Sequence, residues 1–127
     1  MNDSVKKNKK NGFDIQTYRL VFETSMKIHE EIFEKTKNFP LEKRFLIDQL
    51  RKYSKLVCIY LAEAWRMKKN RSFLINKLSA AEQAATKVQI WLEYSWKSNY
   101  INENEFQRID SQYENIFEIL CCAIDNN

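Results

Sequence analysis

The 127-residue sequence contains only one glycine and one proline, far below the usual frequency of either residue. A turn-rich β fold needs many more of both, so their scarcity favours long helices with few interruptions. Because Gly12 is the only glycine, the sequence cannot form a glycine-rich phosphate loop. It also contains no run approaching the roughly 18 apolar residues that a membrane-spanning helix needs. These absences favour an all-α protein with no contact with a membrane.

Histidine and cysteine, the usual residues of metal sites and thiol chemistry, are also scarce. The chain has His29 alone and three cysteines, of which Cys121 and Cys122 are adjacent. This set gives no disulfide framework and no metal-ligand spacing, so we expect no cofactor, no metal and a reducing, cytoplasmic location. The apolar neighbours of Cys58 indicate a buried, inert thiol. Since no nucleophile elbow or paired-carboxylate motif is present either, we expect no enzymatic activity.

Four segments have the apolar spacing of amphipathic helices, and the length of the chain fits one domain. The N-terminus is rich in lysine but has no apolar core behind it, so it does not resemble a secretory signal. We predict a disordered basic tail over residues 1–13 and a four-helix bundle over residues 14–127. The expected helices span about 14–38, 41–67, 72–97 and 102–125.

The second predicted helix contains the longest apolar run of the chain, LVCIYLA at residues 56–62. A helix that is apolar around most of its circumference must be covered on several sides, by its own chain or by other subunits. We therefore predict that this helix lies at the centre of the bundle and at an oligomer interface. The residues expected at that interface are Leu56, Ile59, Tyr60, Trp65 and Trp91.

The charges are unevenly distributed along the sequence, although the net charge is only +4. Residues 42–77 carry ten basic and three acidic side chains, whereas residues 82–127 carry three basic and eight acidic ones. Two interpretations remain open: surfaces of opposite charge that attract each other, or a face on the second and third helices that binds a polyanion. The candidate nucleic-acid-binding residues are Arg51, Lys52, Lys55, Arg66, Lys68, Lys69 and Arg71.

Glu63 lies late in the second helix between small and aromatic residues. It could be a general acid or base, or one half of a structural ion pair. No second carboxylate or histidine is close in sequence, which favours the ion pair. In a helical hairpin that turns at residues 68–72, Glu63 would lie level with Lys77, so we predict that these two side chains pair.

Several short motifs follow one another through the predicted helices: Phe39-Pro40, Gln49-Leu50-Arg51-Lys52, Leu61-Ala62-Glu63-Ala64-Trp65-Arg66, Phe73, Lys77-Leu78-Ser79-Ala80-Ala81-Glu82, Trp91-Leu92 and Tyr100-Ile101. Together they resemble the bacterial four-helix-bundle proteins encoded in intervening sequences of 23S ribosomal RNA genes, in particular a subgroup with AEAWR at the end of the second helix. The resemblance covers about Tyr18 to Ile124. Leu56 and Tyr60 are bulkier than the small residue and the asparagine that are usual in the family.

The resemblance implies an antiparallel up-down-up-down four-helix bundle that assembles as a homopentameric ring. A related protein, the accessory protein of diversity-generating retroelements, also forms a pentamer and binds nucleic acid and a reverse transcriptase through a basic surface. We therefore predict a non-enzymatic, oligomeric accessory protein that binds RNA or DNA. The alternative is a homo-oligomeric scaffold that binds a partner protein, such as a reverse transcriptase, without contacting nucleic acid.

Overall fold

The computed structural model describes residues 12–125, so most of the predicted tail lies outside the described residues. The described chain is all-α and contains no strand. A short 3-10 helix, η1, precedes the second of four long helices. In chain order the elements are α2 (Ile15–Thr36), η1 (Leu41–Lys43), α3 (Arg44–Arg66), α4 (Arg71–Lys97) and α5 (Glu103–Asp125).

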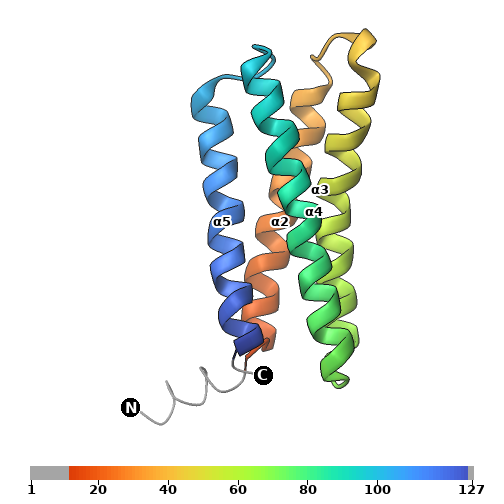
Figure 1. The fold of residues 1–127 in the computed structure, drawn as a ribbon, viewed down its shortest axis with the longest axis vertical. Helices are drawn as coiled ribbons and strands as arrows, with labels where there is room; N and C mark the ends of the chain where they lie inside the picture. Colours follow the sequence, from red (N-terminus) through yellow and green to blue (C-terminus); the bar gives the residue numbers. More distant parts are fainter. Residues whose placement is uncertain (1–11, 126–127) are drawn as a thin grey trace.

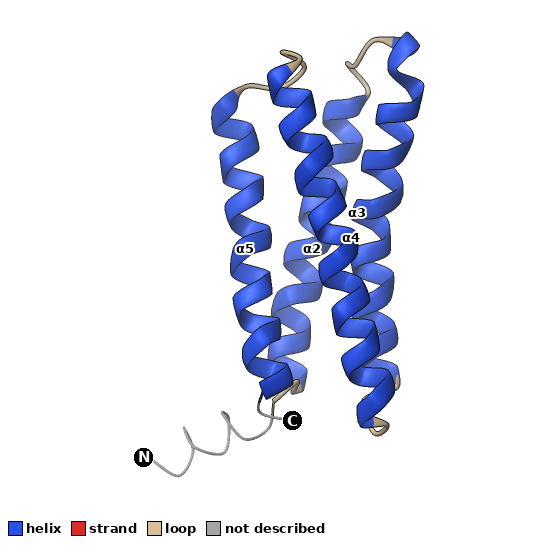
Figure 2. Ribbon diagram, viewed as in Figure 1, coloured by secondary structure: helices blue, strands red, loops and turns tan. Residues whose placement is uncertain are grey.

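The four long helices lie side by side, and the chain reverses direction at each connection between them (Figures 1 and 2). α2 packs against α3 and α5, and α4 packs against the same two helices. The α3–α4 hairpin makes the most extensive contact of all. As Figure 1 shows, the α3–α4 turn lies at the same end of the molecule as the start of α2 and the end of α5.

Local capping explains where the helices begin. The Asp14 carboxylate accepts a hydrogen bond from the Thr17 amide at 2.8 Å, and the Asn70 side chain accepts one from the Phe73 amide at 3.2 Å. At α5, Asn102 and Glu105 cap each other's backbone amides at 2.8 and 2.9 Å, which is a capping box. These caps satisfy amides that the first turn of a helix leaves without partners.

One part of the predicted tail is wrong, because Phe13 belongs to the core. Its side chain is only 4% exposed, and its ring lies 6.0 Å from that of Tyr18 and 6.1 Å from that of Trp65. The aromatic ring buries enough apolar surface to fix the chain directly before the Asp14 cap. The packed domain therefore includes Phe13, which the predicted boundary at residue 14 leaves out.

Tyr113 of α5 is a polar side chain buried in the centre of the core. It is fully buried, and its hydroxyl has no hydrogen-bond partner among the described residues. Burial also raises the pKa of Tyr113 far above its ordinary value. A buried hydroxyl without a partner costs about 1–3 kcal/mol.

We therefore expect Tyr113→Phe to raise the free energy of unfolding by about 1 kcal/mol, measured by urea denaturation. Tyr113→Ala is the matched control, because it removes the ring as well and should cost about 3–5 kcal/mol through the cavity it leaves. A loss of stability in Tyr113→Phe would mean that the hydroxyl contributes a favourable interaction.

Ion pairs join α2 to α5 although their residues are far apart in sequence. Arg108 donates to both carboxylate oxygens of Glu31, with Nη1 3.0 Å from Oε1, and Lys35 pairs with Glu31 and Glu105. The Arg108 hydrogen bond lowers the pKa of Glu31. The Asn102 amide, followed by Lys35, lowers the pKa of Glu105.

These pKa shifts predict a loss of stability in acid. On acidification the unfolded chain takes up protons at these carboxylates near the ordinary pKa of 4.5, before the folded chain does. The free energy of unfolding should therefore fall as the pH drops below about 5 and through the lowered pKa values of Glu31 and Glu105. The double variant Glu31→Gln, Glu105→Gln should flatten this fall in a denaturation series from pH 7 to 3; an unchanged slope would contradict the assignment.

Candidate nucleic-acid and oligomer surfaces

A row of exposed cations follows α3 into the turn before α4. Helical spacing places the α3 members on one side of that helix, facing away from the core. None of the cations in this row forms an ion pair with a carboxylate of residues 12–125. Their charge is therefore available to a polyanion. We call Lys52, Lys55, Arg66, Lys68, Lys69 and Arg71 the basic row.

Arg51, which the sequence grouped with these cations, has a different environment. Its Nε donates to Thr36 Oγ1 at 2.9 Å, and its Nη2 lies 3.4 Å from the Phe33 carbonyl oxygen. The guanidinium also lies 4.1 Å from the centre of the Phe33 ring. Arg51 thus satisfies the C-terminal turn of α2, and we do not count it in the basic row. Sequence alone could not reveal this, because the contact depends on how α2 and α3 are aligned.

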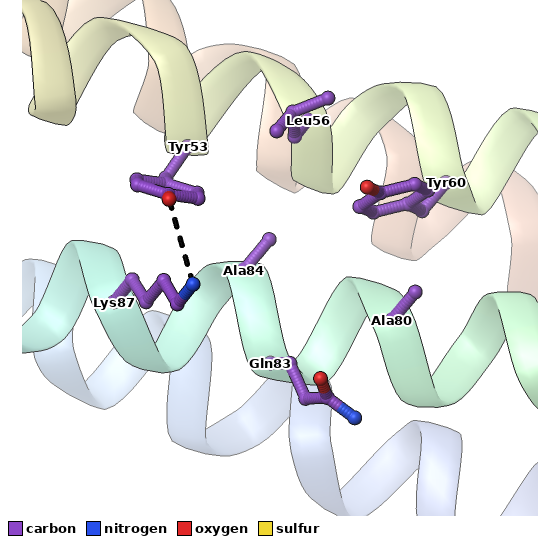
Figure 3. A pocket seen from close by; sticks show the side chains of 7 residues that line it. All are labelled: Tyr53, Leu56, Tyr60, Ala80, Gln83, Ala84 and Lys87. Carbon is purple, nitrogen blue, oxygen red and sulfur yellow. Dashed lines mark hydrogen bonds between the residues drawn. The ribbon is translucent and has the colours of Figure 1, made fainter.

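A second surface, largely apolar, lies along the outer side of the α3–α4 pair. Figure 3 shows Tyr53, Leu56 and Tyr60 of α3 facing Ala80 and Ala84 of α4. The small α4 side chains leave a shallow groove of about 100 Å³, which Lys87 borders with its Nζ 3.4 Å from the Tyr53 hydroxyl.

Further exposed apolar side chains lie beside the groove and beyond it, toward the start of α3 and the end of α4. Ile59 is 47% exposed, Phe45 is 67% exposed and Tyr94 is 47% exposed. The half-buried Trp91 makes edge contacts with the Phe45 and Tyr94 rings at 5.9 and 5.8 Å. We call Phe45, Leu56, Ile59, Tyr60, Trp91 and Tyr94 the apolar strip.

The strip contains four of the five residues predicted at an oligomer interface, together with Phe45 and Tyr94, which the sequence analysis did not name. Phe45 could have been found, since it precedes Leu56 by 11 residues, or about three helical turns, and so lies on the same side of α3. Tyr94 follows Trp91 by three residues, the spacing of neighbours on one helix face. The helical spacing in the sequence is therefore enough to place Phe45 and Tyr94 on the same side as the predicted residues.

Trp65 does not belong to the apolar strip, and its place at an oligomer interface stays a prediction. Its ring stacks on Tyr18 of α2, with centroids 5.1 Å apart and an interplanar angle of 4°. The Lys68 ammonium lies 4.0 Å from the ring centre. Five residues of helix place Trp65 about 140° around α3 from Tyr60, so the two face different neighbours.

Glu63 and Lys77 lie together across the α3–α4 hairpin, as the sequence predicted. Lys77 Nζ is 3.1 Å from Glu63 Oε1, and both side chains are partly exposed. That oxygen is enclosed but receives no hydrogen bond of good geometry, so the contact is ionic rather than directed. Lys77 also lies 5.6 Å from the centre of the Tyr60 ring.

Cys58 does not have the surroundings of a reactive thiol. Cys58 is buried, and burial raises its pKa to about 11, so the thiol is protonated near neutral pH. Within residues 12–125 no group of three or more histidine, cysteine, aspartate or glutamate side chains could hold a metal ion. No helix in that range is long and apolar enough to cross a membrane.

These features define an all-α protein whose candidate sites are two open surfaces, one cationic and one apolar. Comparison with protein families identifies the particular group: the model of the 23S rRNA-intervening sequence proteins matches residues 19–121. Because this match spans most of the sequence, the chain belongs to that family. No curated protein matches the chain.

A crystal structure of a protein of unknown function from the S23 ribosomal protein family of Bacteroides thetaiotaomicron has a similar fold. The TM-score is 0.76 at 22% sequence identity, and the match covers 86% of this chain and 98% of that chain. At this identity the likeness concerns the fold alone.

Proposed function

We propose that the chain is a non-enzymatic, homo-oligomeric accessory protein that binds RNA or DNA through the basic row. The observation that carries this proposal is the set of exposed cations with no acidic partner in the described chain. Lysine and arginine bind nucleic acid by neutralising phosphates and releasing condensed counterions. Contacts of this kind position a nucleic acid but do not read its bases, so we expect little sequence preference.

Self-association through the apolar strip would complete this function. Contiguous exposed apolar surface is uncommon on monomeric proteins and often marks an interaction site. We propose that copies of the antiparallel up-down-up-down bundle assemble through the strip into a homopentameric ring. Such a ring would present several basic rows to one nucleic acid, and linked sites bind far more tightly than single ones.

A salt-series titration of the purified protein against structured RNA and duplex DNA tests the proposal. Tight binding at low salt should weaken linearly on a log–log plot, with a slope of about −0.9 for each duplex phosphate that is neutralised. The slope therefore counts the cations that contact the backbone. No binding to either nucleic acid at low salt would overturn the proposal.

The same apolar strip also favours a second candidate, a scaffold for a partner protein without direct contact with nucleic acid. In that case the exposed Phe45 and Tyr94 would be covered by the partner, and the basic row would face an acidic protein surface. Charge reversal in the basic row separates the two candidates, as described in the Discussion.

A third possibility is an enzyme that uses Glu63, and the substitution Glu63→Gln tests it. Glu63→Gln keeps the shape of the side chain but removes the charge that faces Lys77. For a partly exposed ion pair we expect a loss of about 0–1 kcal/mol in the free energy of unfolding and unchanged nucleic-acid binding. Lys77→Gln is the matched control and should cost a similar amount. An enzymatic activity that is lost in Glu63→Gln at unchanged stability would support a catalytic role for Glu63.

A further inference from the structure

An open hollow lies between α2 and α3, on the border of the basic row. Its volume is about 350 Å³, and its lining consists of His29, Phe33, Asp48, Arg51, Lys52 and Lys55. Three of these side chains are permanent cations and one is a carboxylate, so the hollow is positively charged at neutral pH. Its volume is at the lower end of the range for small-ligand sites.

Hydrogen bonds between α2 and α3 hold two of the side chains that line the hollow, Arg51 and His29. Arg51 is held against α2 by its contacts with Thr36 Oγ1 and the Phe33 carbonyl, so its charge stays in place. Across the helix pair, His29 Nδ1 and the buried Ser54 Oγ share a hydrogen bond of 2.7 Å. This contact leaves Nε2 as the imidazole nitrogen without a partner in the described chain.

Lys52 and Lys55 bring ammonium groups to the same hollow, and the Lys52 ammonium also lies 5.1 Å from the centre of the Tyr53 ring. Both are exposed, and neither pairs with a carboxylate within residues 12–125. Ammonium groups with three donors each suit the oxygen atoms of a phosphate, and so does His29 Nε2 when the imidazole is protonated and this nitrogen donates. We propose that this hollow binds a phosphate group through Lys52, Lys55 and His29.

The charges around His29 make such binding sensitive to pH. Burial, followed by Lys55 and Arg51 of α3, lowers the pKa of His29, while Glu30 of its own helix acts in the opposite direction. A phosphate in the hollow offsets the field of the α3 cations and therefore favours the imidazolium. By linkage, the same phosphate binds more tightly when His29 is protonated.

The phosphate could belong to a nucleic-acid backbone or to a small phosphorylated molecule. The first source rests on the proposed function, because Lys52 and Lys55 are also members of the basic row. The second source does not depend on it. The chain's only histidine allows the two to be separated, since its NMR signal needs no assignment among others.

The experiment follows the His29 ring protons over pH 5 to 8 in the free protein, with inorganic phosphate, and with a structured RNA. Bound phosphate should raise the titration midpoint by about one pH unit, which corresponds to tenfold tighter binding to the imidazolium form. A rise with RNA alone supports a backbone phosphate, and a rise with inorganic phosphate supports an independent small-molecule site. An unchanged midpoint with both ligands overturns the proposal, and RNA binding in the salt titration would then leave the proposed function standing.

Two double variants that lose the same net charge, one inside the hollow and one outside it, separate local contacts from net charge. In the double variant Lys52→Gln, Lys55→Gln the midpoint without ligand should rise, because the field of Lys55 is gone, and the ligand-induced rise should disappear. Arg19→Gln, Lys97→Gln changes the net charge equally at exposed positions outside the lining of the hollow and should behave as the parent protein. A ligand-induced rise that persists in the first variant also overturns the proposal.

Discussion

Replacing Lys68, Lys69 and Arg71 together by glutamate is expected to lower the affinity for structured RNA by about a hundredfold or more at low salt. The three side chains are exposed in and beside the α3–α4 turn, without a carboxylate partner in the described chain. Their loss removes up to three phosphate contacts, and the new carboxylates repel the backbone. Fluorescence anisotropy over roughly 50–200 mM salt should show the lower affinity and a salt slope reduced by about 3.

A matched variant separates local contacts from net charge. Arg19, Lys27 and Lys97 are exposed cations outside the basic row, and their replacement by glutamate changes the net charge by the same amount. This control should retain most of the affinity, because charges beyond a Debye length of about 10 Å are screened. Both variants should keep the parent assembly in light scattering. If the first variant loses its assembly but still binds RNA, the basic row serves contacts between proteins, as in the scaffold alternative.

The all-α class and the positions of the helices follow from features local in sequence. The spacing of Ile109, Tyr113 and Ile116 defines the buried face of α5, and the Asn102–Glu105 capping box marks its first turn. Such features lie within one or two helical turns, so a single sequence contains all the information needed. The α4 start at Arg71 and the α5 start at Glu103 accordingly lie close to their predicted positions.

The structural features that could not be predicted from the sequence depend on contacts between segments that are far apart in the chain. Phe13 is buried because Trp65, far along the chain, lies beside it, and Arg51 is occupied because the end of α2 is within its reach. The α2–α3 hollow likewise requires His29 to face Ser54, which is 25 residues away. The basic row was visible because a row of cations along one helix face and its following turn is itself a local pattern.

Substitutions in the apolar strip are expected to have a large effect on assembly. The double variant Phe45→Gln, Ile59→Gln should convert the oligomer into monomers at micromolar concentration. Both side chains are largely exposed in the single chain, 67% and 47%, so their replacement should leave the bundle folded. Full burial of such a side chain is worth about 1.5–3 kcal/mol, and roughly half to two thirds of each remains to be buried in an interface, so losing both should weaken every contact by about twentyfold or more. Light scattering coupled to size-exclusion chromatography measures the mass directly.

Uncharged substitutions are chosen because Ile59 lies near Lys55 and Arg66 on α3, and the charge of the basic row must stay unchanged. The control is Leu20→Gln, Leu41→Gln, which removes two exposed leucines, 54% and 88% exposed, that are not part of the strip. If the control dissociates while the strip variant stays assembled, the interface involves α2 and η1 instead. A monomeric strip variant should also bind RNA more weakly, since one basic row lacks the gain of about 10²–10⁴ that linked sites can provide. Full RNA affinity in a proven monomer would mean that a single basic row accounts for binding and that assembly serves another purpose.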